Sequence, residues 1–182
     1  MDEVAGVTVA APLIDTRWQA HWQPQFIGTL LFVCRAGEVL LIHKKTGHGA
    51  GRINAPGGKL EPGEGIVACA VRETYEEVGV RVREARVGME LRFVERSGPQ
   101  WLGFALTAHD FSGTPTETRE AKPFWCPIEE IPYARMWPDD AIWLPQLLAN
   151  PLAPPRVADF LFDDERLLEH EFVECESIWS QF

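Results

Sequence analysis

The stretch 57–80, GGKLEPGEGIVACAVRETYEEVGV, constrains the fold of this chain more than any other. Glycines punctuate its first part, helical spacing follows over 65–79, and the run ends at a glycine, as helices often do. At about 100° per residue, Glu73, Glu76 and Glu77 fall within an arc of roughly 100°. Aliphatic side chains occupy another arc, turned roughly 120° away. One face of this helix can therefore pack on a core while the other presents three carboxylates.

Three like charges on one helical turn repel each other and destabilise an isolated helix. A hard divalent cation relieves that repulsion, and Mg²⁺ prefers carboxylate oxygens as ligands. The alternative is an acidic helix face that is simply solvated. The glycines favour the cation, because Gly57 and Gly58 let a backbone carbonyl come close, and Gly63 and Gly65 fit a tight loop that returns to the helix start.

The same stretch carries a pattern with fixed spacing, G-x5-E-x7-R-E-U-x-E-E-x-G-U, where U is aliphatic. Its positions are filled by Gly58, Glu64, Arg72, Glu73, Glu76, Glu77, Gly79 and Val80. The one departure is Thr74, which stands where an aliphatic residue is usual and has about the size of valine. With this pattern the chain resembles the Nudix hydrolase superfamily.

The resemblance implies a Nudix fold, an α+β domain in which a mixed sheet is flanked by helices as an α/β/α sandwich. It also implies hydrolysis of a nucleoside diphosphate linked to a further group. Glu73, Glu76 and Glu77 are then the expected catalytic residues, which bind Mg²⁺ (or Mn²⁺ as a substitute) or orient the attacking water. The Gly57 carbonyl is expected to complete the metal shell, and the cation to neutralise phosphate charge.

The remaining positions of the pattern, Gly58, Glu64, Arg72 and Gly79, are expected to be structural, with Arg72 and Glu64 bracing the loop against the helix. A further acid outside the pattern often takes part in this family. Glu120, in TETREAKPFW, is the candidate for an additional metal ligand or base. The alternative for Glu120 is an exposed loop acid, because the sequence around it is polar.

Three further segments, NAPGGKLEPGE, GTPTETREAKPFW and IPYARMWPDDAIWLPQLL, resemble the MutT-type oxidised-purine nucleoside triphosphatases of this superfamily. The resemblance implies that Asn54, Trp137, Asp139 and Asp140 line a base pocket. An indole offers a flat surface for a purine. Two adjacent acids can share one proton, because ionisation of one raises the pKa of the other. One then accepts from the guanine N–H groups while its neighbour donates to O6. Lys44 is expected near the nucleotide.

Each of these residues has a simpler interpretation. Asp139 and Asp140 precede a helical run and suit the first helical turn, where free N–H groups attract carboxylates. Trp137 can pack in a core, as we expect for Trp143. Asn54 alone would be an ordinary turn residue, and Lys44 a solvated lysine.

The loop before the glycine pair departs from the oxidised-purine enzymes. These carry bulkier aromatic residues around the asparagine, whereas this chain has Ile53, Ala55 and Pro56, and His48 stands where an aromatic is expected. These departures bear on base selectivity more than on catalysis.

The rest of the chain predicts one domain. Strands are expected at 26–34, 39–43, 80–96, 101–109 and 122–128, a closing hairpin over 156–174, a short turn or helix at 129–133 and a second helix at 139–149. Residues 1–25 are expected to form an N-terminal extension, 26–174 the hydrolase domain and 175–182 a C-terminal tail. The four cysteines form no CxxC pair, so we expect reduced, mostly buried thiols and no zinc site.

Composition excludes several classes of protein. The formal net charge is −10, which disfavours a polymeric nucleic acid as partner. No apolar run approaches the ~20 residues that span a bilayer, so no membrane is expected. The N-terminus opens with acids rather than with the positive region of a secretory signal, which indicates a cytoplasmic protein. A monomer or a homodimer that acts on a small nucleotide is the expectation.

Together these features predict an Mg²⁺-dependent hydrolase that converts an oxidised purine nucleoside triphosphate, such as 8-oxo-dGTP, to the monophosphate and pyrophosphate. That activity cleans the nucleotide pool and serves DNA repair. The alternatives are the same chemistry on an unmodified dNTP, a dinucleoside polyphosphate or a nucleotide sugar. A nucleotide-binding domain without turnover is a further alternative, which the intact glutamates disfavour.

Overall fold

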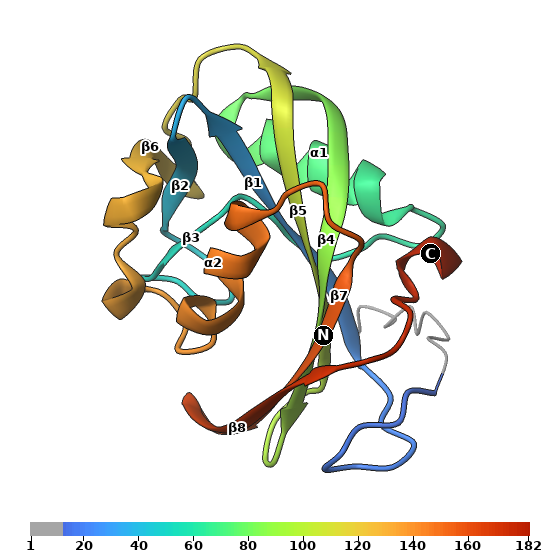
Figure 1. Ribbon diagram of the computed structural model, residues 1–182. Helices are drawn as coiled ribbons and strands as arrows, with labels where there is room; N and C mark the ends of the chain where they lie inside the picture. The colour runs from blue at the N-terminus through green and yellow to red at the C-terminus, as the bar shows by residue number, and fades with distance from the viewer. Residues whose placement is uncertain (1–12) are drawn as a thin grey trace, which may run out of the picture.

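A computed structural model describes residues 13–182 and shows a strongly curved mixed sheet with a helix on each side (Figure 1). The strands are β1 (Phe26–Arg35), β2 (Glu38–Lys44), β3 (Ile53–Asn54), β4 (Arg81–Glu95), β5 (Trp101–Ser112), β6 (Ala121–Pro127), β7 (Arg156–Asp163) and β8 (Arg166–Val173). The helices are α1 (Ile66–Val78) and α2 (Asp140–Ala149), with short 3₁₀ turns at Ile128–Glu130, Tyr133–Arg135 and Trp179–Gln181.

The strand order in the sheet is β3-β2-β1-β5-β4-β7-β8, and β6 pairs with β2 outside this path. Two pairs, β1 with β5 and β4 with β7, are parallel, and the others are antiparallel. A parallel pair needs a long crossover. The crossover between β1 and β5 contains α1 and the loop before it, so the topology sets the glutamate helix against the middle of the sheet.

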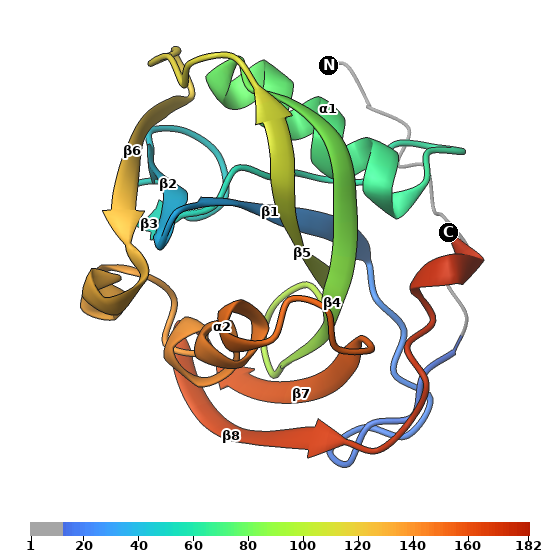
Figure 2. The same ribbon diagram turned by 45° about the horizontal axis from the view of Figure 1, so that its top comes forward.

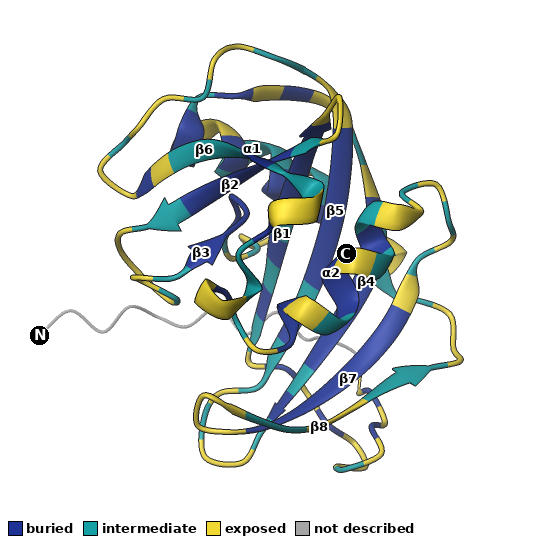
Figure 3. Cartoon of the chain, turned by 60° about the vertical axis from the view of Figure 1, so that its left-hand side comes forward, coloured by how far each residue is buried: buried dark blue, intermediate teal, exposed yellow. Residues whose placement is uncertain are grey.

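Helices α1 and α2 lie on opposite sides of the sheet (Figure 2), and an apolar cluster holds each of them to it. The first contains Ile66, Ala70 and Val78 of α1, and the second contains Trp143 and Leu147 of α2. Side chains alternate between the faces of a strand, so neighbouring residues of β2 enter different clusters. Figure 3 shows the result, with dark, buried central strands and exposed loops around them.

The predicted elements are confirmed in type and order, with shifts of a few residues at their ends. The hairpin after β1 turns on Ala36 and Gly37, which both have positive φ. The short strand β3 was not predicted, because two residues are too few to show a period. The four cysteines are free thiols, as expected, and all but Cys175 are buried.

Both ends of the described chain pack on the domain. Trp22 is fully buried and its indole N–H donates to Gln100 Oε1 at 2.8 Å. Near the other end, the Ser177 hydroxyl and the Ile178 N–H both donate to Glu90 Oε2 at 2.7 Å. The boundaries proposed at 26 and 174 therefore cut through packed segments. Residues 1–12 of the expected extension lie outside the described residues.

Within the described residues, no helix is long and apolar enough to cross a membrane.

Candidate active site

Helix α1 begins after Gly65 and ends at Gly79, whose left-handed conformation (φ 74°) lets its N–H donate to the Tyr75 carbonyl. Thr74, the departure from the glutamate pattern, is fully buried. Its hydroxyl donates to the Ala70 carbonyl at 2.8 Å, so no polar group is left without a partner. The substitution of threonine for an aliphatic residue is thus accommodated inside the helix.

Glu77 is the buried member of the three glutamates. Its carboxylate accepts a hydrogen bond from Lys44 Nζ at 2.8 Å and another from the Gly57 N–H at 3.0 Å. The side chain is 3% exposed and that of Lys44 is 17% exposed. A buried carboxylate needs such partners, because its desolvation is otherwise uncompensated. Glu77 therefore joins α1, the end of β2 and the glycine loop.

Arg72 organises the other carboxylates. It grips Glu64 with two bonds of 2.8 Å, from Nε and Nη2, and this fork closes the glycine loop onto the helix as expected. Its Nη1 also contacts Glu73 at 2.9 Å and the exposed Glu76 at 3.1 Å. The bond from Arg72 holds the pKa of Glu64 below its ordinary value. Burial raises the pKa of Glu73, against the lowering effect of Arg72.

The glycine pair lies against β1 with no room for side chains. Thr29 N–H donates to the Gly58 carbonyl at 2.9 Å, and Leu31 N–H to the Pro56 carbonyl at 2.8 Å. A Cβ on Gly57 would lie 1.9 Å from the Thr29 carbonyl oxygen, and a Cβ on Gly58 would lie 2.3 Å from the Glu73 carboxylate. Both positions thus require glycine, the first for the fold and the second for the site.

These residues fit a divalent cation. The Gly57 carbonyl takes part in no hydrogen bond among the residues described here, so it remains available as a ligand. The glutamates at 73, 76 and 77 point towards Arg72 and Lys44, and no group of three or more His, Cys, Asp or Glu side chains in the described chain is gathered tightly enough to hold a metal. A cation at this site would require Glu73, Glu76 and Glu77 to release these guanidinium and ammonium partners.

Glu120 lies in the loop before β6, next to the end of α1. In that loop, the Thr118 hydroxyl donates to the Glu77 carbonyl at 2.9 Å, and Lys45 N–H donates to the Glu120 carbonyl at 2.8 Å. The Glu120 carboxylate is 53% exposed and its partner is Arg119, at 3.8 Å. The structure thus brings the backbone of Glu120 to the site while its side chain faces solvent.

The predicted base-pocket acids are buried. Asp139 Oδ2 accepts from the Trp143 indole at 2.8 Å, and Asp140 Oδ2 accepts from the Trp137 N–H at 2.9 Å. Each aspartate is 2% exposed, and Trp143 is fully buried, as expected for a core residue. Asp139 stands at the N-cap of α2 but makes no side-chain cap bond. Helix capping therefore does not account for this carboxylate.

The two carboxyl groups favour their protonated forms. Burial raises the pKa of Asp139 to about 6. Burial and then the charge of Asp139 raise the pKa of Asp140 well above its ordinary value. Two such neighbours lose their first proton in a shared step and resist the loss of the second. Near neutral pH the pair can thus offer one acceptor and one donor.

Asp140→Asn should stabilise the protein at pH 8 and have little effect near pH 4. The folded pKa values lie above the unfolded value of 3.8, so the folded state holds protons that the unfolded chain releases. Stability is therefore full below that value and falls as the pH rises through the folded pKa values. Asparagine imitates the protonated acid and removes one such group, worth about 1.4 kcal/mol per pKa unit and roughly 2–4 °C in Tm per kcal/mol.

Thermal melts at several pH values test this, with the exposed Asp164→Asn as control. A Tm difference between Asp140→Asn and the unmodified protein that does not grow between pH 4 and pH 8 would contradict it.

Two other side chains complete the predicted pocket. Asn54 is buried at the end of β3, and its Oδ1 accepts from the Ala55 N–H at 2.9 Å, which leaves its amide N–H groups for a ligand. Trp137 is half-buried, with the Arg52 guanidinium 4.2 Å from its ring centroid. Arg52 was not singled out in the sequence. The sequence AGRIN shows only that Arg52 lies two residues before Asn54, and the residues that Arg52 contacts are distant in sequence.

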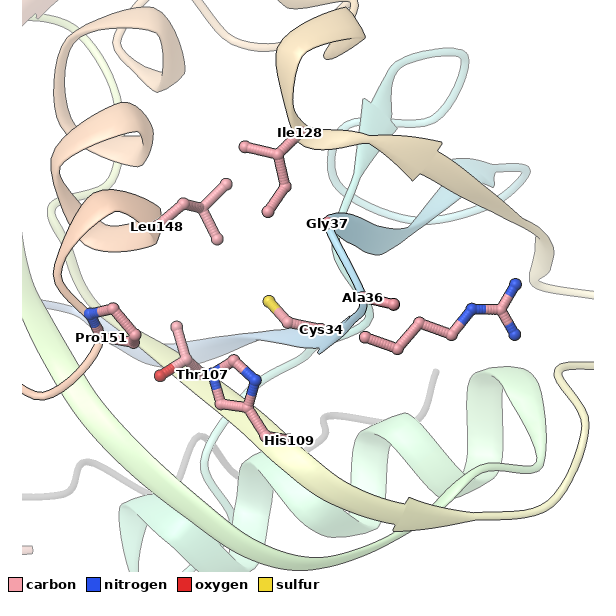
Figure 4. A pocket seen from close by; sticks show the side chains of 9 residues that line it. Cys34, Ala36, Gly37, Thr107, His109, Ile128, Leu148 and Pro151 are labelled. Atoms are coloured by element: carbon pink, nitrogen blue, oxygen red, sulfur yellow. The ribbon is translucent and has the colours of Figure 1, made fainter.

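The surface has two hollows away from the glutamate helix, and the second adjoins the predicted base pocket at Pro138, the residue after Trp137. One of about 80 Å³ is lined by the β1–β2 turn, with Cys34, and by Thr107, Ile128 and Leu148 (Figure 4). Typical ligand sites are roughly 300–1,000 Å³, so a nucleotide does not fit there. The other, of about 550 Å³, lies between Pro138 and the β7–β8 turn. Its acidic lining does not suit a phosphate chain.

Comparison with known proteins agrees with this geometry. The model of the NUDIX domain family matches residues 24–147. The chain belongs to the Nudix family. Its members are hydrolases that act on small nucleotides and generally use divalent metal cations, and the fold and glutamate pattern found here are those predicted from the resemblance.

Individual Nudix proteins show a closer likeness. The chain is 40% identical to an oxidized purine nucleoside triphosphate hydrolase of Mus musculus over 121 residues. The matched region covers 66% of this chain and 78% of the relative. It is 37% identical over the same length to the protein of that name from Danio rerio, with the same coverage. A crystal structure of a MutT protein from Bacillus halodurans superposes with a TM-score of 0.70 at 25% identity, over 81% of this chain and 97% of that one.

Proposed function

We propose that this Nudix hydrolase converts oxidised purine nucleoside triphosphates, such as 8-oxo-dGTP, to the monophosphate and pyrophosphate, and so cleans the nucleotide pool. One observation carries the choice of a purine base, namely the buried Asp139–Asp140 pair beside Trp137. Two buried acids with raised pKa values would be costly if they served the fold alone. The names of the mouse and zebrafish relatives support the same substrate class.

The paired acids match the polar edge of a guanine. The ionised carboxylate accepts from the N1–H and N2–H₂ groups, and the protonated one donates to O6. Asn54 offers a further donor, and Trp137 a surface on which the base stacks, worth about 1–3 kcal/mol per base in comparable sites. A shift of the shared proton would let Asp139 and Asp140 exchange roles, which suits an oxidised adenine edge as well.

The catalytic centre comprises Glu73, Glu76, Glu77 and the Gly57 carbonyl, with Glu120 as an additional ligand or base. Mg²⁺ is the proposed cation, with Mn²⁺ as a substitute, and when bound it neutralises the phosphate charge and makes a water molecule more acidic. Arg72 pairs with Glu73 and Glu76, which would have to release it in order to bind the cation, while its bonds to Glu64 keep the loop on the helix.

Lys44 has two partners in this scheme. Its ammonium group neutralises Glu77 in the present structure, at 2.8 Å. Once a metal takes over that neutralisation, Lys44 is free to turn to the phosphate chain or the nucleoside. This exchange keeps the buried carboxylate compensated at every stage. A nucleotide and its cation would thus enter together.

Pyrophosphate release from 8-oxo-dGTP, 2-oxo-dATP, dGTP and dATP with Mg²⁺ tests the proposal. We expect kcat/KM for an oxidised purine to exceed that for its unmodified counterpart by at least tenfold, since one well-placed hydrogen bond is worth roughly that factor. Equal rates on all four would refute base selectivity and retain the catalyst. No turnover of any of the four would point to a dinucleoside polyphosphate or a nucleotide sugar as substrate.

A further inference from the structure

Three rings form a stack at the edge of the proposed base pocket. The His48 imidazole lies between the indoles of Trp137 and Trp101, with centroid distances of 5.1 and 5.0 Å. Its plane is within 16° of the first indole and 19° of the second. The indoles come from segments far apart in sequence, the turn before α2 and the start of β5. Each indole lies within 19° of the imidazole plane, and we take the two as the walls of a slot that the imidazole fills.

Two groups cover the Trp137 ring in this arrangement. The His48 imidazole stacks on it at 5.1 Å, and the Arg52 guanidinium lies over it at 4.2 Å from the ring centroid. A base that stacks on this indole must therefore displace one of the two. Arg52 is anchored, because it donates to the Met136 carbonyl at 3.2 Å and to Glu165 at 2.7 Å. His48 makes no hydrogen bond within the described chain, and ring contacts hold it.

The side chain of His48 can leave the stack without movement of its loop. Gly47, Gly49 and Gly51 have φ values of 73°, 80° and 90°, which only glycine adopts at little cost. Backbone hydrogen bonds close the loop, from the Gly51 N–H to the Lys44 carbonyl at 2.8 Å and from the Lys44 N–H to the Arg52 carbonyl at 3.0 Å, so the loop holds its place while the imidazole rotates. His48 is exposed at the surface, although the two indoles cover part of its ring, so the ring can leave outwards. This partial cover and the nearby Lys59 and Lys44 lower the pKa of His48, so the ring that must be displaced is the neutral form at neutral pH.

Trp101 is placed as a fixed second wall. It pairs with Phe26 across the parallel strands β5 and β1, and the two rings contact each other at 4.7 Å. A flat base that replaces the imidazole would therefore stack on two indoles instead of one. Because a purine has a larger face than an imidazole, it gains more from the same walls.

We propose that His48 holds the nucleobase slot closed between Trp137 and Trp101, that the entering base displaces it, and that Trp101 is the second stacking wall. This inference rests on the proposed function only in that a nucleotide base enters beside Trp137. It makes His48 a competitor of the substrate and Trp101 a determinant of affinity.

The test is the affinity of the product nucleotides 8-oxo-dGMP and dGMP, measured by calorimetry on the full chain. His48→Ala should bind both about 3- to 10-fold more tightly, because no ring has to be displaced, and His48→Phe should bind more weakly than the unmodified protein. Trp101→Leu should weaken binding about 5- to 10-fold, as loss of one stacking partner does elsewhere. The matched control is His43→Ala, whose ring stacks on Phe124 alone, at 4.8 Å.

Unchanged or weaker binding by His48→Ala would overturn the proposal, as would unchanged binding by a Trp101→Leu protein that circular dichroism shows to be folded. Tighter binding by Arg52→Gln but not by His48→Ala would show that the guanidinium is the group displaced. Failure of the proposed function gives a different result. If 8-oxo-dGMP and dGMP bind with equal affinity and His48→Ala tightens the binding of both, the slot is supported and selectivity for the oxidised base is refuted.

Discussion

Glu77→Gln is expected to lower kcat by roughly 10³-fold or more, about 4 kcal/mol in the barrier to hydrolysis, since each 1.4 kcal/mol is tenfold. Among Glu73, Glu76 and Glu77, only the buried Glu77 carboxylate accepts hydrogen bonds from both the glycine loop and Lys44. Glutamine has nearly the same shape but carries no charge to bind a cation. Steady-state pyrophosphate release with Mg²⁺ measures the loss.

The same substitution should also cost stability. It leaves the Lys44 ammonium, 17% exposed, without its partner, and an unpaired buried charge is costly. Adding Lys44→Met removes that charge, so the double variant should regain part of the lost Tm but none of the activity. The exposed Glu129→Gln is the control for loss of an acid as such. Recovery of activity together with stability in the double variant would show that Glu77 serves the fold and not the reaction.

Most of the secondary structure followed from short-range patterns. Gly79 ends α1, as the sequence indicated, and the Ala36–Gly37 turn lies between two strands that the sequence predicted. These features depend on neighbours in the chain, which a sequence displays directly. The packing of the C-terminal tail did not follow, because Ser177 reaches Glu90 from 87 positions away. Such contacts depend on the sheet topology, which no local period encodes.

The candidate site divides in the same way. The glutamate pattern has fixed spacing on one helix, so Glu73, Glu76 and Glu77 could be named from the sequence alone. The ion pair between Glu77 and Lys44 could not, since it joins residues 33 apart through the fold. The stack of His48 between Trp101 and Trp137 was equally hidden. The sequence thus identified the glutamates of the proposed catalytic site. The structure was needed to find the ring stack from which we propose that a base displaces His48.

Gly57 and Gly58 are expected to respond differently to substitution by alanine, although each substitution adds only one methyl group. Gly58→Ala should reduce hydrolysis by about 10²-fold or more with little change in Tm. The three atoms nearest to its Cβ all belong to the end of the Glu73 side chain, the first at 2.3 Å, and that end can rotate away. Rotation costs the fold little but removes a carboxylate from the metal site, and misplacement by about 1 Å can cost 10²-fold in rate.

Gly57→Ala should instead lower both stability and activity. Its Cβ meets backbone, with the Thr29 oxygen at 1.9 Å and Leu30 Cα at 3.0 Å, so the loop must move off β1. We expect a loss of roughly 1–3 kcal/mol or more, the usual cost of overpacking, and a displaced metal-binding carbonyl.

Gly65→Ala is the matched control for both, because its Cβ would lie 3.8 Å from the Phe182 carbonyl oxygen, an ordinary contact. Chemical denaturation and pyrophosphate release on the three variants make the comparison. If Gly58→Ala lost as much stability as Gly57→Ala, then folding itself would require the close contact between Gly58 and the Glu73 carboxylate. A Gly58→Ala protein that is both stable and fully active would show that hydrolysis does not need the Glu73 carboxylate where this structure places it.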